Sequence, residues 1–161
     1  MNAPIATAAI KTTKTNVVGS GLKLKARVDY EFLGISEEEA ELWESKVERE
    51  FDLWADKKHC DALWLNNFYE MQGLIFMGQL MNGDGFCLLK YQKPTPYMPY
   101  GLRLHLIESD RVSTPYLMAM PLGNTWMPYW GKNPDNGNEI YSGVEIDQDG
   151  AVVAYWICNV Y

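Results

Sequence analysis

The chain has 161 residues, of which 47% are hydrophobic, 13% aromatic and 22% charged, and its net charge is −7. This composition is typical of a folded globular protein and excludes a disordered chain, and the length predicts a single domain over 1–161. Because the basic residues are scattered and outnumbered, a surface that holds DNA tightly by its phosphates is disfavoured, whereas an acidic wall past which DNA slides is compatible with this charge.

A helix that ends in a glycine turn is predicted over 2–18. Asn2 is a suitable cap, and Pro4 in the first turn costs no hydrogen bond. Gly19 and Gly21 favour the left-handed conformation that ends a helix. The apolar face comprises Ile5, Ala6, Ala9, Ile10, Thr13 and Val17. Because the chain opens directly on this helix, we expect a piece of a longer protein and a helix whose apolar face packs incompletely.

An alternation of apolar and basic residues over 22–28 predicts a half-buried strand, and its lysines suit the edge of a sheet. A helix is predicted over 37–56, because Ser36 and Glu39 form a capping box at its start. Its core stripe recurs at spacings of three and four and comprises Ala40, Trp43, Val47, Phe51 and Trp54. The glutamates on its other side are interpreted as a solvated helix face rather than as acid or base catalysts.

A third helix and two strands are predicted next. The helix covers 61–81 and ends in the Asn82-Gly-Asp-Gly85 turn. This turn has neither the phosphate-loop nor the calcium-loop pattern, so we interpret it as a helix-to-strand connection. Strands follow over 86–91 and, after a proline-rich break, over 102–108, where leucines occupy alternate positions.

The remainder of the chain is predicted as a long irregular segment, 114–138, followed by a hairpin. The aromatic residues expected to be exposed on this segment are Tyr116, Trp126, Tyr129 and Trp130. Strands over 140–146 and 152–158 pair across a glycine-containing turn. The chain stops in strand-like sequence at Tyr161, which again predicts a piece of a longer protein. The order of elements predicts an α+β fold, a mostly antiparallel β-sheet with about three helices packed on it.

No pattern in the chain nominates a catalytic, metal or cofactor site, and we expect none. The two histidines, His59 and His105, and the three cysteines lack metal-ligand spacing, so neither a zinc site nor a disulfide framework is predicted. No signal peptide is predicted, and the apolar stretch 74–81 is too short to span a bilayer.

Two other functions are compatible with the residues. A binding module would stack sugars or peptides on the aromatic residues of 114–138. A hydrolase would use paired carboxylates with one of the histidines, and it requires carboxylates that approach one another in a cleft. The candidate carboxylates are Glu70, Asp84, Glu108 and Asp110.

Four stretches carry recognisable motifs in a fixed order. The first joins Asn2-Ala-Pro-Ile-Ala6 to Thr15-Asn-Val-Val-Gly-Ser-Gly-Leu-Lys-Leu24. The second is the Trp43, Phe51 and Trp54 helix followed by Asp61, and the third is the helix, turn and strand around 82–85. The fourth comprises Leu104-His-Leu-Ile-Glu-Ser-Asp-Arg-Val112, Ile140-Tyr-Ser-Gly-Val-Glu-Ile-Asp-Gln-Asp-Gly150 and Val153-Ala-Tyr-Trp-Ile157. In this order they resemble the lambda-type phage portal family, from whose usual pattern Asp84-Gly85 and Ala151 depart.

The resemblance implies a structural, non-enzymatic subunit of a portal ring, commonly of twelve copies, at one vertex of a phage capsid. Double-stranded DNA is packaged and ejected through the channel of such a ring without sequence-specific binding. The implied partners are further copies of the subunit, the capsid protein, the terminase and head-completion proteins, in the virion and in the host cytoplasm during assembly. The resemblance implies no membrane, and it assigns the chain to the wing region at the ring periphery, without the complete stem and clip.

Overall fold

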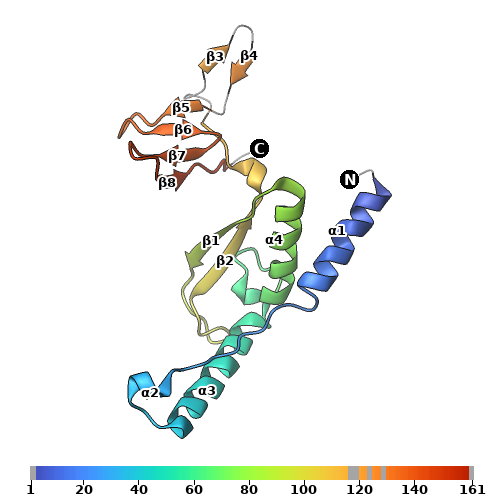
Figure 1. The fold of residues 1–161 in the computed structure, drawn as a ribbon, viewed down its shortest axis with the longest axis vertical. Coiled ribbons are helices and arrows are strands. Elements are labelled where there is room, and N and C mark those ends of the chain that lie inside the picture. The colour runs from blue at the N-terminus through green and yellow to red at the C-terminus, as the bar shows by residue number, and fades with distance from the viewer. Residues whose placement is uncertain (1–2, 116–119, 123–124, 128–129, 160–161) are drawn as a thin grey trace. The chain divides into compact units, whose positions relative to one another are not determined.

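The computed structural model describes residues 3–115, 120–122, 125–127 and 130–159, and for 120–122, 125–127 and 130 it describes the backbone alone. The chain forms two compact units, Met1–Ile107 and Glu108–Tyr161 (Figure 1). The single domain over 1–161 stays a prediction.

The first unit contains four α-helices and one two-stranded sheet among its described residues. The helices are α1 (Pro4–Val17), α2 (Tyr30–Leu33), α3 (Glu37–Ala55) and α4 (Phe68–Asn82), and a 3-10 turn, η1 (Lys58–Cys60), follows α3. β1 (Phe86–Tyr91) pairs antiparallel with β2 (Leu102–Ile107). The helix predicted over 37–56 and the strand predicted over 86–91 are confirmed, and the strand predicted over 102–108 ends at Ile107.

The core of the first unit lies between α3, α4 and β2. Its buried residues are Trp54, Ala55, Cys60, Met71 and Met98. The rings of Phe51, Trp54 and Phe68 contact one another in tilted and edge-to-face arrangements with centroids 5.3 to 5.6 Å apart. The indole N–H of Trp54 donates to the carbonyl of Leu102 at 3.0 Å. The apolar stripe of α3 thus becomes the contact of this helix with α4 and the sheet.

α1 packs beside α4 and contributes no buried residue (Figure 1). Pro4 stands in its first turn as predicted, whereas Ala3 takes the cap position without a side-chain hydrogen bond. The predicted cap, Asn2, lies outside the described residues. Ile5 is 87% exposed and Val17 is 53% exposed, so the predicted incomplete packing of the apolar face is confirmed.

The strand predicted over 22–28 is wrong. These residues, which we call the strap, pair with no strand among the described residues. Side chains of α3 and α4 accept backbone N–H groups of the strap that a neighbouring strand would accept in a sheet. The turn before it requires Gly21, because φ is +107° and an added Cβ would lie 2.5 Å from the Cβ of Tyr69. The connector after the strap contains α2, which Asp29 caps.

The helix predicted over 61–81 begins later than expected, at Phe68. Asp61 is buried, and its carboxylate accepts three backbone N–H groups of the following residues at 2.8 to 3.2 Å. Such local bonds compete with helix formation and hold 61–66 as a turn. Asn67 then caps α4 and forms a capping box with Glu70, which the sequence analysis missed.

The second unit contains a four-stranded antiparallel sheet and a hairpin among its described residues. The sheet has the order β5 (Trp130–Lys132), β6 (Glu139–Tyr141), β7 (Val144–Ile146) and β8 (Val152–Tyr155). The hairpin of β3 (Met120–Leu122) and β4 (Thr125–Met127) lies inside the segment that was expected to be irregular. A 3-10 turn, η2 (Ser109–Arg111), precedes these strands.

The strand predicted over 140–146 is wrong in its middle, because Ser142 and Gly143 form a turn that separates β6 from β7. The strand predicted over 152–158 ends at Tyr155, although β7 and β8 pair as expected. The α+β class is confirmed. The mostly β-sheet architecture is wrong, since more described residues lie in α-helices than in strands.

Candidate functional site

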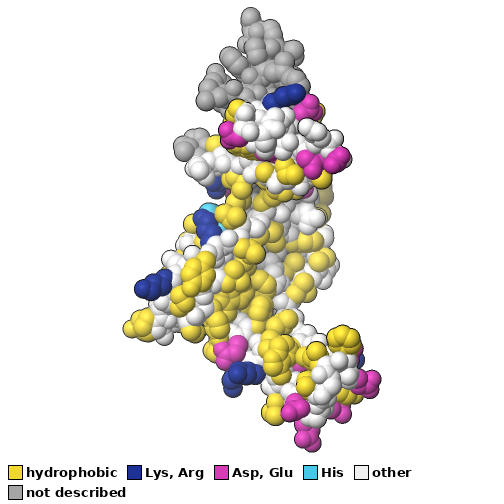
Figure 2. Space-filling view, turned by 90° about the vertical axis from the view of Figure 1, so that its left-hand side faces the viewer, with side chains coloured by type: hydrophobic (Ala, Val, Ile, Leu, Met, Phe, Trp, Pro, Cys, Tyr) yellow, Lys and Arg dark blue, Asp and Glu magenta, His cyan; other side chains and the backbone are white. Residues whose placement is uncertain are grey.

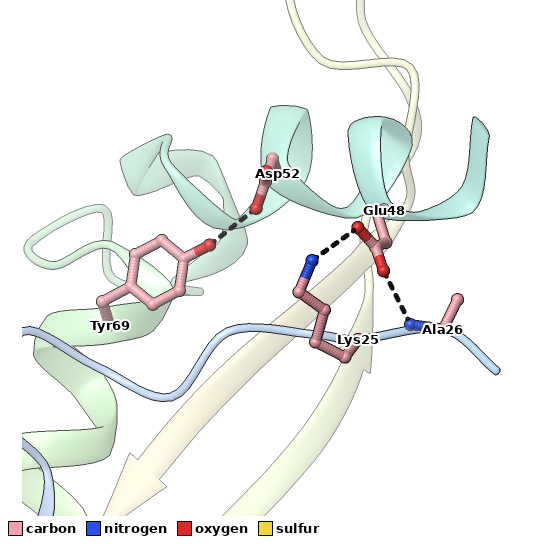
Figure 3. Close-up of polar contacts among 5 residues, drawn as sticks. All are labelled: Lys25, Ala26, Glu48, Asp52 and Tyr69. Carbon is pink, nitrogen blue, oxygen red and sulfur yellow. Dashed lines mark hydrogen bonds and ion pairs between the residues drawn. The ribbon is translucent and has the colours of Figure 1, made fainter. Parts of the chain in front are cut away.

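The first residue of the strap, Leu22, is hydrogen-bonded to α4. The side chain of Gln72 accepts the N–H of Leu22 at 2.6 Å and donates to the carbonyl of the same residue at 3.0 Å. Close by, Tyr69 of α4 donates its hydroxyl to Asp52 of α3 at 2.8 Å (Figure 3). Burial, and then the hydrogen bond to Asp52, raises the pKa of Tyr69 to about 12. The phenol therefore stays protonated at neutral pH and keeps the two helices joined.

The strap is fastened to α3 through alternate backbone amides. Ala26 donates to Glu48 at 3.0 Å and Val28 donates to Glu44 at 2.7 Å. Alternate residues of an extended chain are about 6.6 Å apart and helix positions four apart rise about 6 Å, so the two spacings match. Lys25 adds an ion pair to Glu48 at 3.4 Å (Figure 3). The strap therefore has a defined position on one face of α3.

A largely apolar pocket of about 400 Å³ opens on another face of α3. Its lining residues are Glu50, Phe51, Trp54, Phe68, Tyr100, Leu102 and Leu104. We call it the aromatic pocket. The hydroxyl of Tyr100 donates to the carboxylate of Glu50. The Glu50 side chain is 42% exposed, so this carboxylate lies where the pocket meets solvent.

Glu145 of β7 is a buried carboxylate whose partners in the described residues are all neutral. The side-chain amides of Asn133, Asn136 and Asn138 donate to it at 2.7 to 3.2 Å, and the indole N–H of Trp156 does so at 2.9 Å. These bonds, led by those from Asn136 and Asn138, lower the pKa of Glu145 to about 2. The arrangement holds the turn between β5 and β6, so we assign Glu145 a structural role.

We expect Glu145→Gln to destabilise the second unit at neutral pH and to flatten its dependence on pH between about 5 and 2. The folded pKa lies below the ordinary glutamate value of about 4.3, so the carboxylate stabilises the fold fully above pH 5 or so. This stabilisation disappears as the pH falls toward 2. Glutamine also turns an N–H₂ group toward donors that need an acceptor. Thermal unfolding at pH 7, 5 and 3 measures the effect.

Asp149→Asn is the matched control, because it removes one negative charge from an exposed turn of the same unit. Its unfolding temperature should follow that of the unchanged protein at each pH. A Glu145→Gln variant that loses as much stability on acidification as the unchanged protein would contradict the assignment.

Of the four carboxylates expected for a hydrolase, two lie in the first unit and two in the second. Glu70 serves the capping box of α4, and Asp84 is exposed in the turn after that helix. Glu108 and Asp110 belong to the second unit. The ring of His59 packs at a tilt against the ring of Trp64 with centroids 4.3 Å apart. Within the described part of the chain, no group of three or more histidine, cysteine, aspartate or glutamate side chains is placed to hold a metal ion.

The structure does not describe the side chains of the aromatic residues expected to be exposed on 114–138, so the binding-module hypothesis stays a prediction. No helix among the described residues combines the length and apolar character that crossing a bilayer needs.

The sequence comparisons define the class of protein. A model of the family described as phage portal protein, lambda family, matches residues 1–161. The chain belongs to this family of structural, non-enzymatic proteins, and the resemblance found in its four motifs is thereby confirmed.

The chain is also similar to a protein described as a probable portal protein of Halomonas phage phiHAP-1. The two are 29% identical over 111 residues, which cover 69% of the chain. The matched part spans only 18% of the length of that relative.

Proposed function

We propose that the chain forms the wing region of a longer portal subunit, which assembles into a ring of about twelve copies at one vertex of a phage capsid. Double-stranded DNA enters and leaves the capsid through the channel of this ring. Further partners are the capsid protein, the terminase and head-completion proteins. The subunit acts in the virion and, during assembly, in the host cytoplasm. The observation that carries the proposal is the family match over all 161 residues.

The surface of the first unit supports a role in assembly. Exposed large hydrophobic residues include Phe32, Leu89, Tyr91 and Tyr97, each of which is at least 68% exposed. Figure 2 shows hydrophobic side chains gathered on the face of this unit that carries β1 and β2. Extended exposed apolar surface of this kind is typical of proteins that contact partners. A scaffold subunit that packs against neighbours in a ring accounts for this surface.

Electron microscopy of the complete portal subunit tests the proposal. We expect a ring with an axial channel, and light scattering should give a mass of about twelve subunits. A complete subunit that stays monomeric at assembly concentrations, or that forms particles without a channel, would overturn the proposed function.

A further inference from the structure

We propose that the strap of one copy docks on the aromatic pocket of a neighbouring copy, where Lys23 or Arg27 reaches the carboxylate of Glu50. This inference rests on the proposed assembly into a ring. It assigns two surfaces of the first unit to one contact between subunits.

The aromatic pocket suits a long basic side chain. Its walls are apolar, and a single carboxylate, that of Glu50, lies at its edge. Lysine and arginine combine an apolar stem with a charged end, so they fill apolar surface while their charge remains near solvent. Aromatic faces such as that of Trp54 also attract cations. Glu50 accepts a hydrogen bond from Tyr100, and the exposed guanidinium of Arg49 lies 3.7 Å from its Oε1, so a docked cation would use the lone pairs that remain.

The strap supplies basic side chains without ion-pair partners. Of its three cations, Lys25 is paired with Glu48. Lys23 and Arg27 are exposed, and neither makes an ion pair within the described part of the chain. Leu22 and Leu24, which alternate with the cations, are also exposed. The strap therefore offers both charge and apolar surface that complement an acidic, apolar pocket.

A strap cannot serve the pocket of its own chain. Glu44 and Glu48 are four residues apart on one stripe of α3 and hold the strap there. At 100° per residue, Glu50 projects about 140° and Trp54 about 100° from the mean direction of the two glutamates. The docked cation must therefore come from a second copy.

The contact joins two different surfaces of the same unit and is therefore heterologous. Contacts of this type generate closed rings when the rotation between copies closes, which agrees with the assembly proposed above. A DNA phosphate fits the strap less well, because the carboxylates of Glu44 and Glu48 lie beside it.

Zero-length carbodiimide coupling, which joins lysine amines to carboxylates, tests the contact in the complete subunit. Rings are assembled from equal amounts of ¹⁴N- and ¹⁵N-labelled subunits, and peptides are identified by mass spectrometry. We expect mixed-isotope peptides that join Lys23 to Glu50. Arg27→Lys supplies a second reactive amine for the same coupling. The Lys25–Glu48 pair should give same-isotope peptides, which verifies that the strap is docked on its own helix.

Charge variants provide an independent measurement. Glu50→Gln should raise the subunit concentration at half assembly about fivefold, the order expected for one exposed ion pair per contact. Glu41→Gln, an exposed site on the same helix, should leave it unchanged. The strap variant with both Lys23→Glu and Arg27→Glu should weaken assembly, and so should the pocket variant Glu50→Lys. Combining all three substitutions in one subunit should restore assembly. Circular dichroism verifies that each variant remains folded.

The outcomes separate the two proposals. Rings that lack the mixed-isotope Lys23–Glu50 peptide and assemble normally with Glu50→Gln would overturn the contact while the portal function stands. Failure of the unchanged complete subunit to form any ring would overturn both.

Discussion

Trp54→Ala is expected to lower the free energy of unfolding of the first unit by about 4 kcal/mol, the range typical of a buried tryptophan. The side chain is 7% exposed, packs at a tilt against the rings of Phe51 and Phe68, and donates to the carbonyl of Leu102. Truncation would enlarge the aromatic pocket, which Trp54 lines, and would remove one of the two side-chain hydrogen bonds that the Leu102 carbonyl accepts. Urea unfolding followed by far-ultraviolet circular dichroism reports on this unit, because the described α-helices all belong to it.

Trp43→Ala is the matched control on the same predicted stripe of α3. Trp43 is 53% exposed, so its truncation should cost about 1 kcal/mol or less. The denaturant slope should be the same in both variants, so that the midpoints compare directly. Equal losses of stability in the two variants would contradict the described core.

Gly143→Ala is expected to destabilise the second unit by about 4 kcal/mol. Its φ of +85° costs an L-residue about 1 to 2 kcal/mol, and crowding adds about 1 to 3 kcal/mol. An added Cβ would lie 2.5 Å from the backbone nitrogen of Ser113 and 2.8 Å from the carbonyl carbon of Val112. Backbone atoms of a paired segment cannot move aside as the end of a flexible side chain can. Hydrogen exchange of the β6 to β8 amides measures the local opening energy.

Gly150→Ala separates the two causes. Gly150 has nearly the same φ, +83°, but nothing lies within 4 Å of an added Cβ. Its substitution should therefore cost only the conformational part, about 1 to 2 kcal/mol. If hydrogen exchange gives the same local opening free energy for both alanine variants, the close approach of Gly143 to the 112–113 backbone is not the reason that position 143 requires glycine.

Elements governed by local physics agree with the sequence analysis. The capping box of Ser36 and Glu39 and the spacing from Ala40 to Trp54 specify α3. The alternation of leucines from Leu102 specifies β2. Each of these signals lies within one short stretch of the sequence.

Segments whose partners are distant in the sequence differ from the predictions. The alternation over 22–28 does indicate an extended chain, but Glu44, Glu48 and Gln72 replace the strand that it was expected to pair with. The stripe of α3 also predicts equal burial for Trp43 and Trp54, and only the latter reaches the core. Periodicity identifies the apolar side of a helix without showing how far along that side its partners extend.

The polar cluster around Glu145 had a signal that the sequence analysis did not use. Asn133, Asn136 and Asn138 fall within six residues and precede a glutamate in a predicted strand, two positions after Gly143. Asparagines at such density offer side-chain donors, but their common acceptor becomes visible only when β6 and β7 fold back on each other.

The sequence by itself determined the family, the α+β class and the long capped helix, because these depend on motif order, composition and interactions between residues three or four apart. The tertiary structure decided the path of the strap and the aromatic pocket. Each of these joins residues about 20 to 50 positions apart. Which donor meets which acceptor over such separations depends on how the elements pack, and no local pattern records that.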